Sequence, residues 1–131
     1  MEKTSRINAK PFEIRNQMGE QLWEMIQAHP QKGDWKKSVM AWGLMLNSSS
    51  HPDGYQAVQM VTEDVACAYE HGVPTDIIKF ALGQVYEWRK IQLKAQGRRD
   101  GEIVRGEITP EIIKEKLRGK ISQEYFDNIF S

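Results

Sequence analysis

Cysteine and long apolar runs are the clearest absences from this 131-residue sequence. Cys67 is the only cysteine, so no intrachain disulfide is possible, and this indicates a reducing, cytoplasmic setting. The longest apolar run, Val39 to Leu46, has eight residues, whereas a membrane-spanning helix needs roughly 20. The opening residues, MEKTSRINAKPF, are polar and lack the apolar stretch of a signal peptide. We therefore expect a cytoplasmic protein that has no membrane partner.

Net charge is also absent, because 18 Lys and Arg residues balance 18 Asp and Glu residues. No overall field therefore attracts the chain to nucleic acid or to an anionic membrane. The charge is nevertheless segregated along the chain. Residues 38–78 carry five acids and no Lys or Arg, a net charge of −5, whereas residues 79–120 carry eleven bases and six acids, a net charge of +5.

The hydrophobic pattern follows the helical period in six segments that Gly and Pro residues separate. The four long segments are residues 11–29, 35–47, 53–71 and 76–96, and two short ones begin after Thr109 and Ser122. No segment has the alternation typical of a long strand. The pattern predicts an all-α fold, a compact bundle of about four main helices plus two short C-terminal helices.

Residues that start and stop helices predict the boundaries of these segments. Asp34, Thr75 and Thr109 are suited to N-caps, and Gly72 is suited to a left-handed C-cap. Residues 1–131 are then a single helical domain, divided into a core (11–96), a Gly-rich joint (97–108) and a C-terminal helical tail (109–131). A minimal hairpin within the joint is an alternative, although a two-stranded ribbon is marginal by itself.

Metal and catalytic motifs are sparse. Cys67 and His71 are four residues apart on one predicted helix, but two ligands do not complete a zinc site. Three serines precede His51, yet the chain has no G-x-S-x-G turn and no Gly-rich phosphate loop. We therefore predict no catalytic residues, no metal and no cofactor.

Carboxylates offer one enzymatic alternative. Glu20 and Glu24 lie on the first predicted helix, and Glu63 and Glu70 lie on the third. Paired acidic helices can hold Mg²⁺, an arrangement that resembles the all-α nucleoside-triphosphate pyrophosphohydrolases. The E-E-x-x-E run of that family does not occur in this chain. A Mg²⁺-dependent nucleotide phosphohydrolase is therefore the third of three hypotheses.

Apolar helix surface is the most unusual feature of the sequence, because the segments 35–47 and 76–96 carry more of it than one core face requires. Such a surplus favours a non-catalytic protein–protein interaction module, for example a small subunit, an adaptor or an inhibitor of a larger assembly. Its partner is another protein or a second copy of the chain. The candidate anchor residues are Trp42, Trp88, Tyr125, Phe126 and Phe130.

Basic residues near the end of the fourth segment support a second hypothesis. We call Arg89, Lys94, Arg98 and Arg99 the basic strip. In the interaction module this strip supplies charged contacts. Alternatively, residues 89–105 bind nucleic acid, with the strip on phosphates and Trp88 stacked on a base.

Overall fold

Five helices make up the part of the chain that the computed structural model describes, residues 35–96 and 106–131, and no strand occurs there. The helices are α2 (Trp35–Ser48), α3 (Gly54–Glu70), α4 (Thr75–Gln96), α5 (Pro110–Leu117) and α6 (Gln123–Ile129). This confirms the expected all-α fold. The predicted first helix, residues 11–29, and most of the predicted joint lie outside the described residues.

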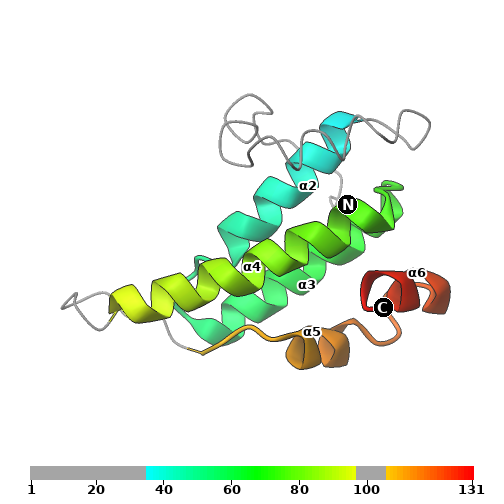
Figure 1. Cartoon of the computed structure of the whole chain (residues 1–131). Coiled ribbons are helices and arrows are strands. Elements are labelled where there is room, and N and C mark those ends of the chain that lie inside the picture. Colours follow the sequence, from blue (N-terminus) through cyan, green and yellow to red (C-terminus); the bar gives the residue numbers. More distant parts are fainter. Residues whose placement is uncertain (1–34, 97–105) are drawn as a thin grey trace.

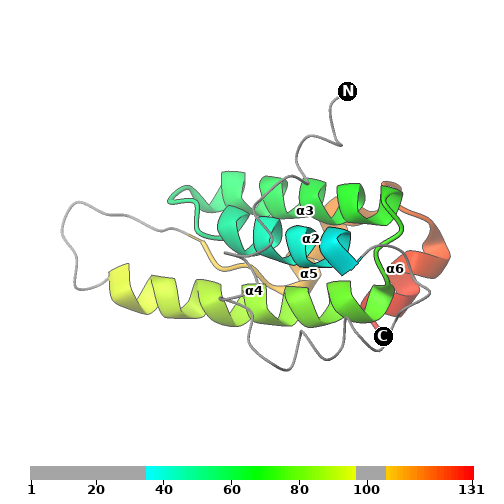
Figure 2. The same ribbon diagram turned by 90° about the horizontal axis from the view of Figure 1, so that it is seen from above.

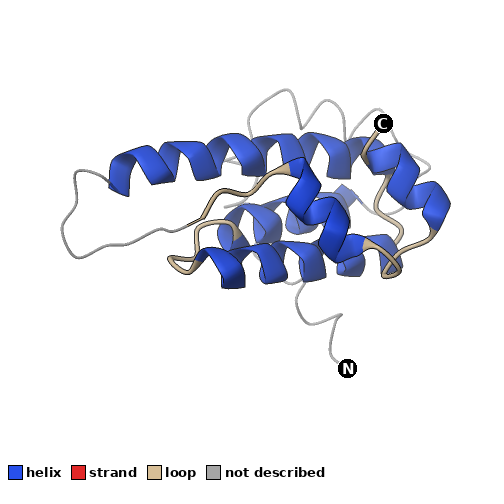
Figure 3. Ribbon diagram, turned by 90° about the horizontal axis from the view of Figure 1, so that it is seen from below, coloured by secondary structure: helices blue, strands red, loops and turns tan. Residues whose placement is uncertain are grey.

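The described helices form three layers. Figure 1 shows that α2 and α4 run in the same direction while α3 runs in the opposite one. Figure 2 shows α2 between α3 and α4 when the molecule is seen from above, and α2 packs against both. Seen from the other side, α5 and α6 cover the opposite face, α5 against α3 and α6 against α4 (Figure 3). The core between α3 and α4 is therefore covered on both faces.

Side-chain caps fix the starts of three helices. Asp53 Oδ1 accepts hydrogen bonds from the backbone N–H groups of Tyr55 (2.9 Å) and Gln56 (3.3 Å). Thr109, as the sequence predicts, and Ser122 cap α5 and α6 in the same way. Thr75, in contrast, is the first residue of α4 and not its N-cap.

Small and branched apolar residues line the core that α3 and α4 share with α2. Ala57, Val61, Val65 and Ala68 recur at helical spacing along α3, and all four are buried. From α4 the same core receives Ile77, Ile78, Ala81, Leu82 and Val85, and from α2 it receives Ala41, Trp42 and Met45. Within the described residues, no helix is long and apolar enough to cross a membrane.

The C-terminal tail docks on this core. Ile113 and Leu117 of α5 and Phe126 and Ile129 of α6 are buried in the same apolar cluster as the long helices. Gly119, with a φ of +80°, makes the turn between the two short helices, a conformation that costs glycine little. Helices of eight and seven residues are too short to be stable alone, so this docking maintains them.

Two isoleucines of α4 provide a matched test of the core. Ile77 is fully buried, whereas Ile91 has an exposed fraction of 56%. Because Ile77→Ala leaves a cavity, it should lower the free energy of unfolding by about 2–5 kcal/mol. Ile91→Ala should change it by about 0.5 kcal/mol or less. Urea denaturation followed by circular dichroism measures both, and equal losses would contradict this assignment of the core.

Candidate functional site

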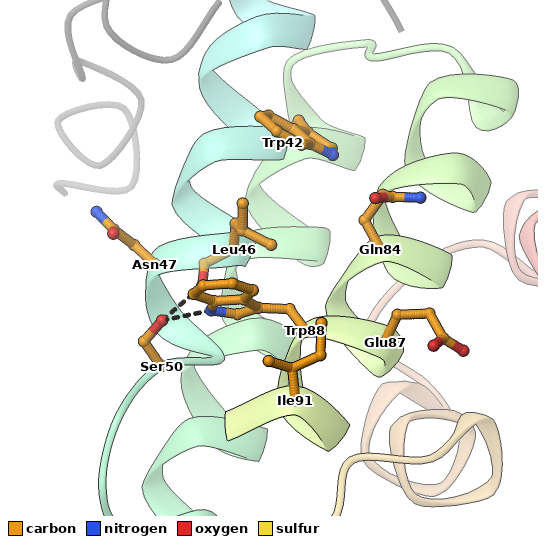
Figure 4. A pocket seen from close by; sticks show the side chains of 8 residues that line it. All are labelled: Trp42, Leu46, Asn47, Ser50, Gln84, Glu87, Trp88 and Ile91. Carbon is orange, nitrogen blue, oxygen red and sulfur yellow. Dashed lines mark hydrogen bonds between the residues drawn. The ribbon is translucent and has the colours of Figure 1, made fainter. Parts of the chain in front are cut away.

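A groove between α2 and α4 forms a cavity lined by described residues. It has a volume of about 530 Å³ and an open, largely apolar lining. Figure 4 shows residues from both helices around it, including Trp42, Leu46, Ser50, Gln84, Trp88 and Ile91. A cleft of this size, apolar with a few polar groups at its edge, is typical of a binding site. We refer to it as the α2–α4 groove.

Trp88 and Ile91 supply the exposed apolar surface of the groove. Trp88 has an exposed fraction of 39% and Ile91 one of 56%, although both are large and hydrophobic. The indole of Trp88 does not move freely, because its Nε1 donates a hydrogen bond to Ser50 Oγ (2.9 Å). This bond joins α4 to the end of α2 and holds one face of the ring toward solvent. The groove thus presents a pre-oriented aromatic surface.

Trp42 lines the same groove from α2 and is almost completely buried, with an exposed fraction of 2%. In Figure 4 its ring lies between α2 and α4. Within residues 35–96 and 106–131, the Trp42 Nε1–H has no hydrogen-bond acceptor. A buried indole N–H usually has a partner, and leaving one without costs roughly 1–3 kcal/mol.

Arg89 is buried, with an exposed fraction of 0%, and its hydrogen bonds hold one end of the groove in place. Its Nη1 donates to the carbonyl oxygens of Ser49 and His51, both at 2.7 Å, and its Nε donates to the carbonyl oxygen of Gly106 at 2.8 Å. Burial lowers the pKa of Arg89 from its ordinary value, and the negative charge of Asp53 opposes that shift. Arg89 therefore ties three separate backbone segments together.

The surroundings of Arg89 reinforce this connection. The Gln92 amide extends the network when its nitrogen faces the Ser49 carbonyl oxygen (3.2 Å) and its oxygen faces Ser50 Oγ (3.1 Å). A Cβ atom at Gly106, whose φ is +80°, would lie 3.4 Å from Gly54 Cα. The chain leading into α5 thus passes close to the start of α3, where a side chain would be strained.

A polar contact holds the end of α2 against α3. Ser48 Oγ donates to Asp64 Oδ2, and both residues are 2% exposed. A buried carboxylate that accepts a hydrogen bond is far less costly than one that accepts none. This contact and the Trp88–Ser50 bond anchor the same end of α2, one to each neighbouring helix.

The structure does not gather the five predicted anchors at one place. Trp42 and Trp88 both line the α2–α4 groove. Tyr125, Phe126 and Phe130 lie on or beside α6, where Phe126 is buried and the other two are half-buried. The Tyr125 hydroxyl donates to the Val73 carbonyl oxygen (2.7 Å), and the rings of Phe126 and Phe130 are 4.9 Å apart. These three residues dock the tail on the core, so we leave them out of the binding site.

The basic strip is divided in the same way. Arg89 is buried and hydrogen-bonded to three carbonyl groups, so it does not offer a surface contact, contrary to the expectation. Lys94 is exposed in the last turn of α4. Arg98 and Arg99 lie outside the described residues. The physical reason is that the Arg89 side chain points toward backbone carbonyl groups of two loops, and a guanidinium, with five N–H donors, can satisfy several such acceptors.

The metal and carboxylate alternatives gain no support from the geometry. Cys67 Sγ lies 3.7 Å from His71 Nδ1, which is also 2.9 Å from the Cys67 carbonyl oxygen. Among the described residues, no group of three or more potential ligands could hold a metal ion. Glu63 and Glu70 are exposed on α3, and Glu20 and Glu24 lie outside the described residues.

Sequence reasoning missed Ile91, Gln84 and Ser50 as members of the groove. Ile91 follows Trp88 by three residues and therefore shares a face with it on a helix. That spacing alone could have identified the pair. Ser50, by contrast, joins the groove only because α2 and α4 run side by side, which no local pattern reveals.

Comparison of the chain with protein-family models, with curated proteins and with solved structures finds no match.

Removing the Arg89 side-chain charge should destabilise the fold. Arg89→Met retains most of the aliphatic volume but leaves three carbonyl groups without their donor, each at a cost of about 1–3 kcal/mol if it stays buried. We expect a loss of at least about 2 kcal/mol in the free energy of unfolding. Lys90→Met, at the exposed neighbouring position, should cost about 0.5 kcal/mol or less. Urea midpoints that agree for the two variants would refute this role of Arg89.

Two half-buried tyrosines should make the fold sensitive to alkaline pH. Burial raises the pKa of Tyr86 and of Tyr125, with smaller contributions from Glu111 and Tyr69 respectively. The unfolded chain ionises its tyrosines near pH 10 while the folded protein keeps these two protonated. The stabilising contribution of these two protonated tyrosines is therefore fully present below about pH 10. Above that pH, the free energy of unfolding falls by up to about 1.4 kcal/mol per pH unit for each tyrosine. Urea midpoints between pH 9 and 11 should fall less steeply for Tyr125→Phe, and an unchanged slope would contradict this account.

Proposed function

We propose that the protein is a protein–protein interaction module that binds an amphipathic helix in the α2–α4 groove. The observation that carries this proposal is the exposure of Trp88 and Ile91 beside a largely apolar cavity. Soluble proteins seldom leave such adjoining large side chains in water without a use for them. The proposal keeps two of the predicted anchors, Trp42 and Trp88, and adds Ile91.

The energetics favour a protein partner. Burying a large apolar side chain completely contributes roughly 1.5–3 kcal/mol, and Trp88 and Ile91 would each gain a part of that on binding. Tryptophan is enriched among the residues that dominate binding energy at protein interfaces. Because its Nε1–H already bonds to Ser50, Trp88 pays little further ordering cost when a partner arrives.

The shape and polarity of the groove favour a helix as the ligand. Two neighbouring helices that run in the same direction form a channel into which the apolar stripe of a third helix can pack. A nucleic acid is less well matched, because Arg89 is buried and Lys90 pairs with Glu87 (3.6 Å) at this edge.

A photo-crosslinker at position 91 tests the proposal. p-Benzoylphenylalanine replaces Ile91 in one protein and Tyr55 in a control protein. Tyr55 is also exposed, but its ring packs against Lys116 of α5 and so belongs to another face. In cells of the native host, we expect position 91 to capture a distinct protein that position 55 does not capture. Adding Trp88→Ala should reduce that capture at least fivefold.

The same experiment has clear contrary outcomes. Equal crosslinking patterns at positions 91 and 55 would mean that the groove has no specific partner. Capture at position 91 that Trp88→Ala leaves unchanged would show that the exposed indole does not contribute. Circular dichroism of each variant confirms that the helices persist, which separates lost binding from lost folding.

A further inference from the structure

We infer that the helix bound at the α2–α4 groove is α4 of a second copy of this chain, so that two copies pair antiparallel through the C-terminal halves of their α4 helices. This inference rests on the proposed function and names its partner. Four properties of α4 lead to it: the spacing of its exposed side chains, the cavities beside them, the placement of the nearby charges, and the projection of the helix from the fold.

The exposed side chains in the C-terminal half of α4 have the spacing of a coiled-coil seam. Four exposed positions are separated by steps of four, three and four residues, and they are Gln84, Trp88, Ile91 and Ala95. This alternation places them in one line along the helix, as at the a and d positions of a heptad repeat. We call this line the α4 seam. Its two large apolar side chains lie at its centre, where a paired helix would bury them.

Cavities lie on both sides of Ile91, so this side chain forms a ridge. The α2–α4 groove lies on the side of Trp88, and a second cavity of about 380 Å³ lies on the side of Lys90 and Lys94. A ridge beside a groove can match a copy of itself about a two-fold axis, because each ridge enters the groove of the other copy. A contact of this kind is complete with two copies and leaves no further site open.

The charges beside the α4 seam favour an antiparallel pair. Glu87 and Lys94 are seven residues apart, so they occupy the same flank of the seam. In an antiparallel pair each flank meets the same flank of the second copy, which brings Glu87 of each copy near Lys94 of the other. In a parallel pair this flank would meet the opposite one, where Val85 and Gln92 carry no charge. Two opposite-charge contacts therefore select the antiparallel direction.

One register satisfies the apolar and the charged contacts together. With residue 90 at the two-fold axis, residues at one level in the two copies have numbers that sum to 180. Trp88 of one copy is then one residue, or about 1.5 Å along the helix, from the level of Ile91 of the other. Glu87 has the same offset from Lys94 of the other copy. Lys90 lies outside the seam and pairs with Glu87 of its own copy (3.6 Å).

The position of α4 in the fold leaves room for this pairing. Figures 1 and 2 show its C-terminal end extending beyond the neighbouring ends of α2 and α3. Lys94 and Ala95, near this end, are exposed. In the proposed register only the C-terminal halves of the two α4 helices overlap, so the rest of each copy lies at an opposite end of the pair.

Exchange of the two charges tests the inference. Glu87→Lys alone and Lys94→Glu alone each place like charges at both contacts of the pair, whereas a mixture of the two variants restores opposite charges at both. In sedimentation equilibrium of the full-length protein at low salt, we expect each variant alone to raise the dimer Kd at least tenfold. The equal mixture should dimerise about as tightly as the unmodified protein. Glu124→Lys, the same change at an exposed position of α6, should leave the Kd unchanged.

The mixture also separates lost pairing from lost folding, because both variants must be folded to pair with each other. A mixture that dimerises as weakly as either variant alone would show that the two charges do not meet across the pair, and it would overturn the inference. Unmodified protein that sediments as a monomer at high micromolar concentration would overturn it as well.

Crosslinking of the purified full-length protein locates the contact. With p-benzoylphenylalanine at position 91, we expect illumination to give a product of twice the mass of the chain, in which position 91 is joined to an α4 peptide of the second copy. The position 55 protein should not give this product. Crosslinks from position 91 to α3, α5 or α6 of the second copy would contradict the α4 pairing.

The outcomes distinguish this inference from the proposed function. If the protein is a monomer and position 91 captures a different protein in cells, the inference fails and the proposed function stands. If the protein is a monomer and position 91 captures no protein that position 55 does not, both fail. A dimer crosslinked through α4, which Trp88→Ala weakens at least fivefold, supports both.

Discussion

The buried guanidinium of Arg89 is the interaction on which the rest of the described structure depends. It joins α4 to the loop after α2, through the carbonyl groups of Ser49 and His51, and to the chain before α5, through Gly106. A planar group with five donors can satisfy several carbonyl groups at once, which neither lysine nor an apolar residue can do. Because Trp88 is its neighbour on α4 and bonds to Ser50, the same network sets the geometry of the α2–α4 groove.

Local patterns in the sequence were sufficient to predict the five helices that the structure describes. Caps such as Thr109 and Ser122, and the turn at Gly119, depend on residues within a few positions of each other. The burial of Arg89 could not be predicted in this way, because two of its acceptors lie 38 and 40 residues away in the chain. In the sequence it belongs to a basic cluster, and only the packing of α4 against two loops shows that it is structural.

Which aromatic residues are buried and which are exposed also could not be predicted from local sequence patterns. Trp42 and Trp88 look alike in a periodic pattern, yet Trp42 on α2 is buried in the core and Trp88 on α4 is exposed at the edge of the groove. Tyr125, Phe126 and Phe130 were reasonable candidates for an interface. They instead bury the tail helices against the core, so their apolar surface serves the fold. Which apolar residues remain available for binding depends on tertiary packing.

Part of the apolar helix surface noted in the sequence lies in the α2–α4 groove, whose geometry depends on the Arg89 network. Hydrogen exchange of the arginine side-chain N–H groups, followed by NMR on the full-length protein, tests this dependence most directly. The account predicts that the Arg89 Nε–H exchanges far more slowly than that of the exposed Arg118, because it is buried and bonded to the Gly106 carbonyl oxygen. Equal exchange rates for the two Nε–H groups would contradict it.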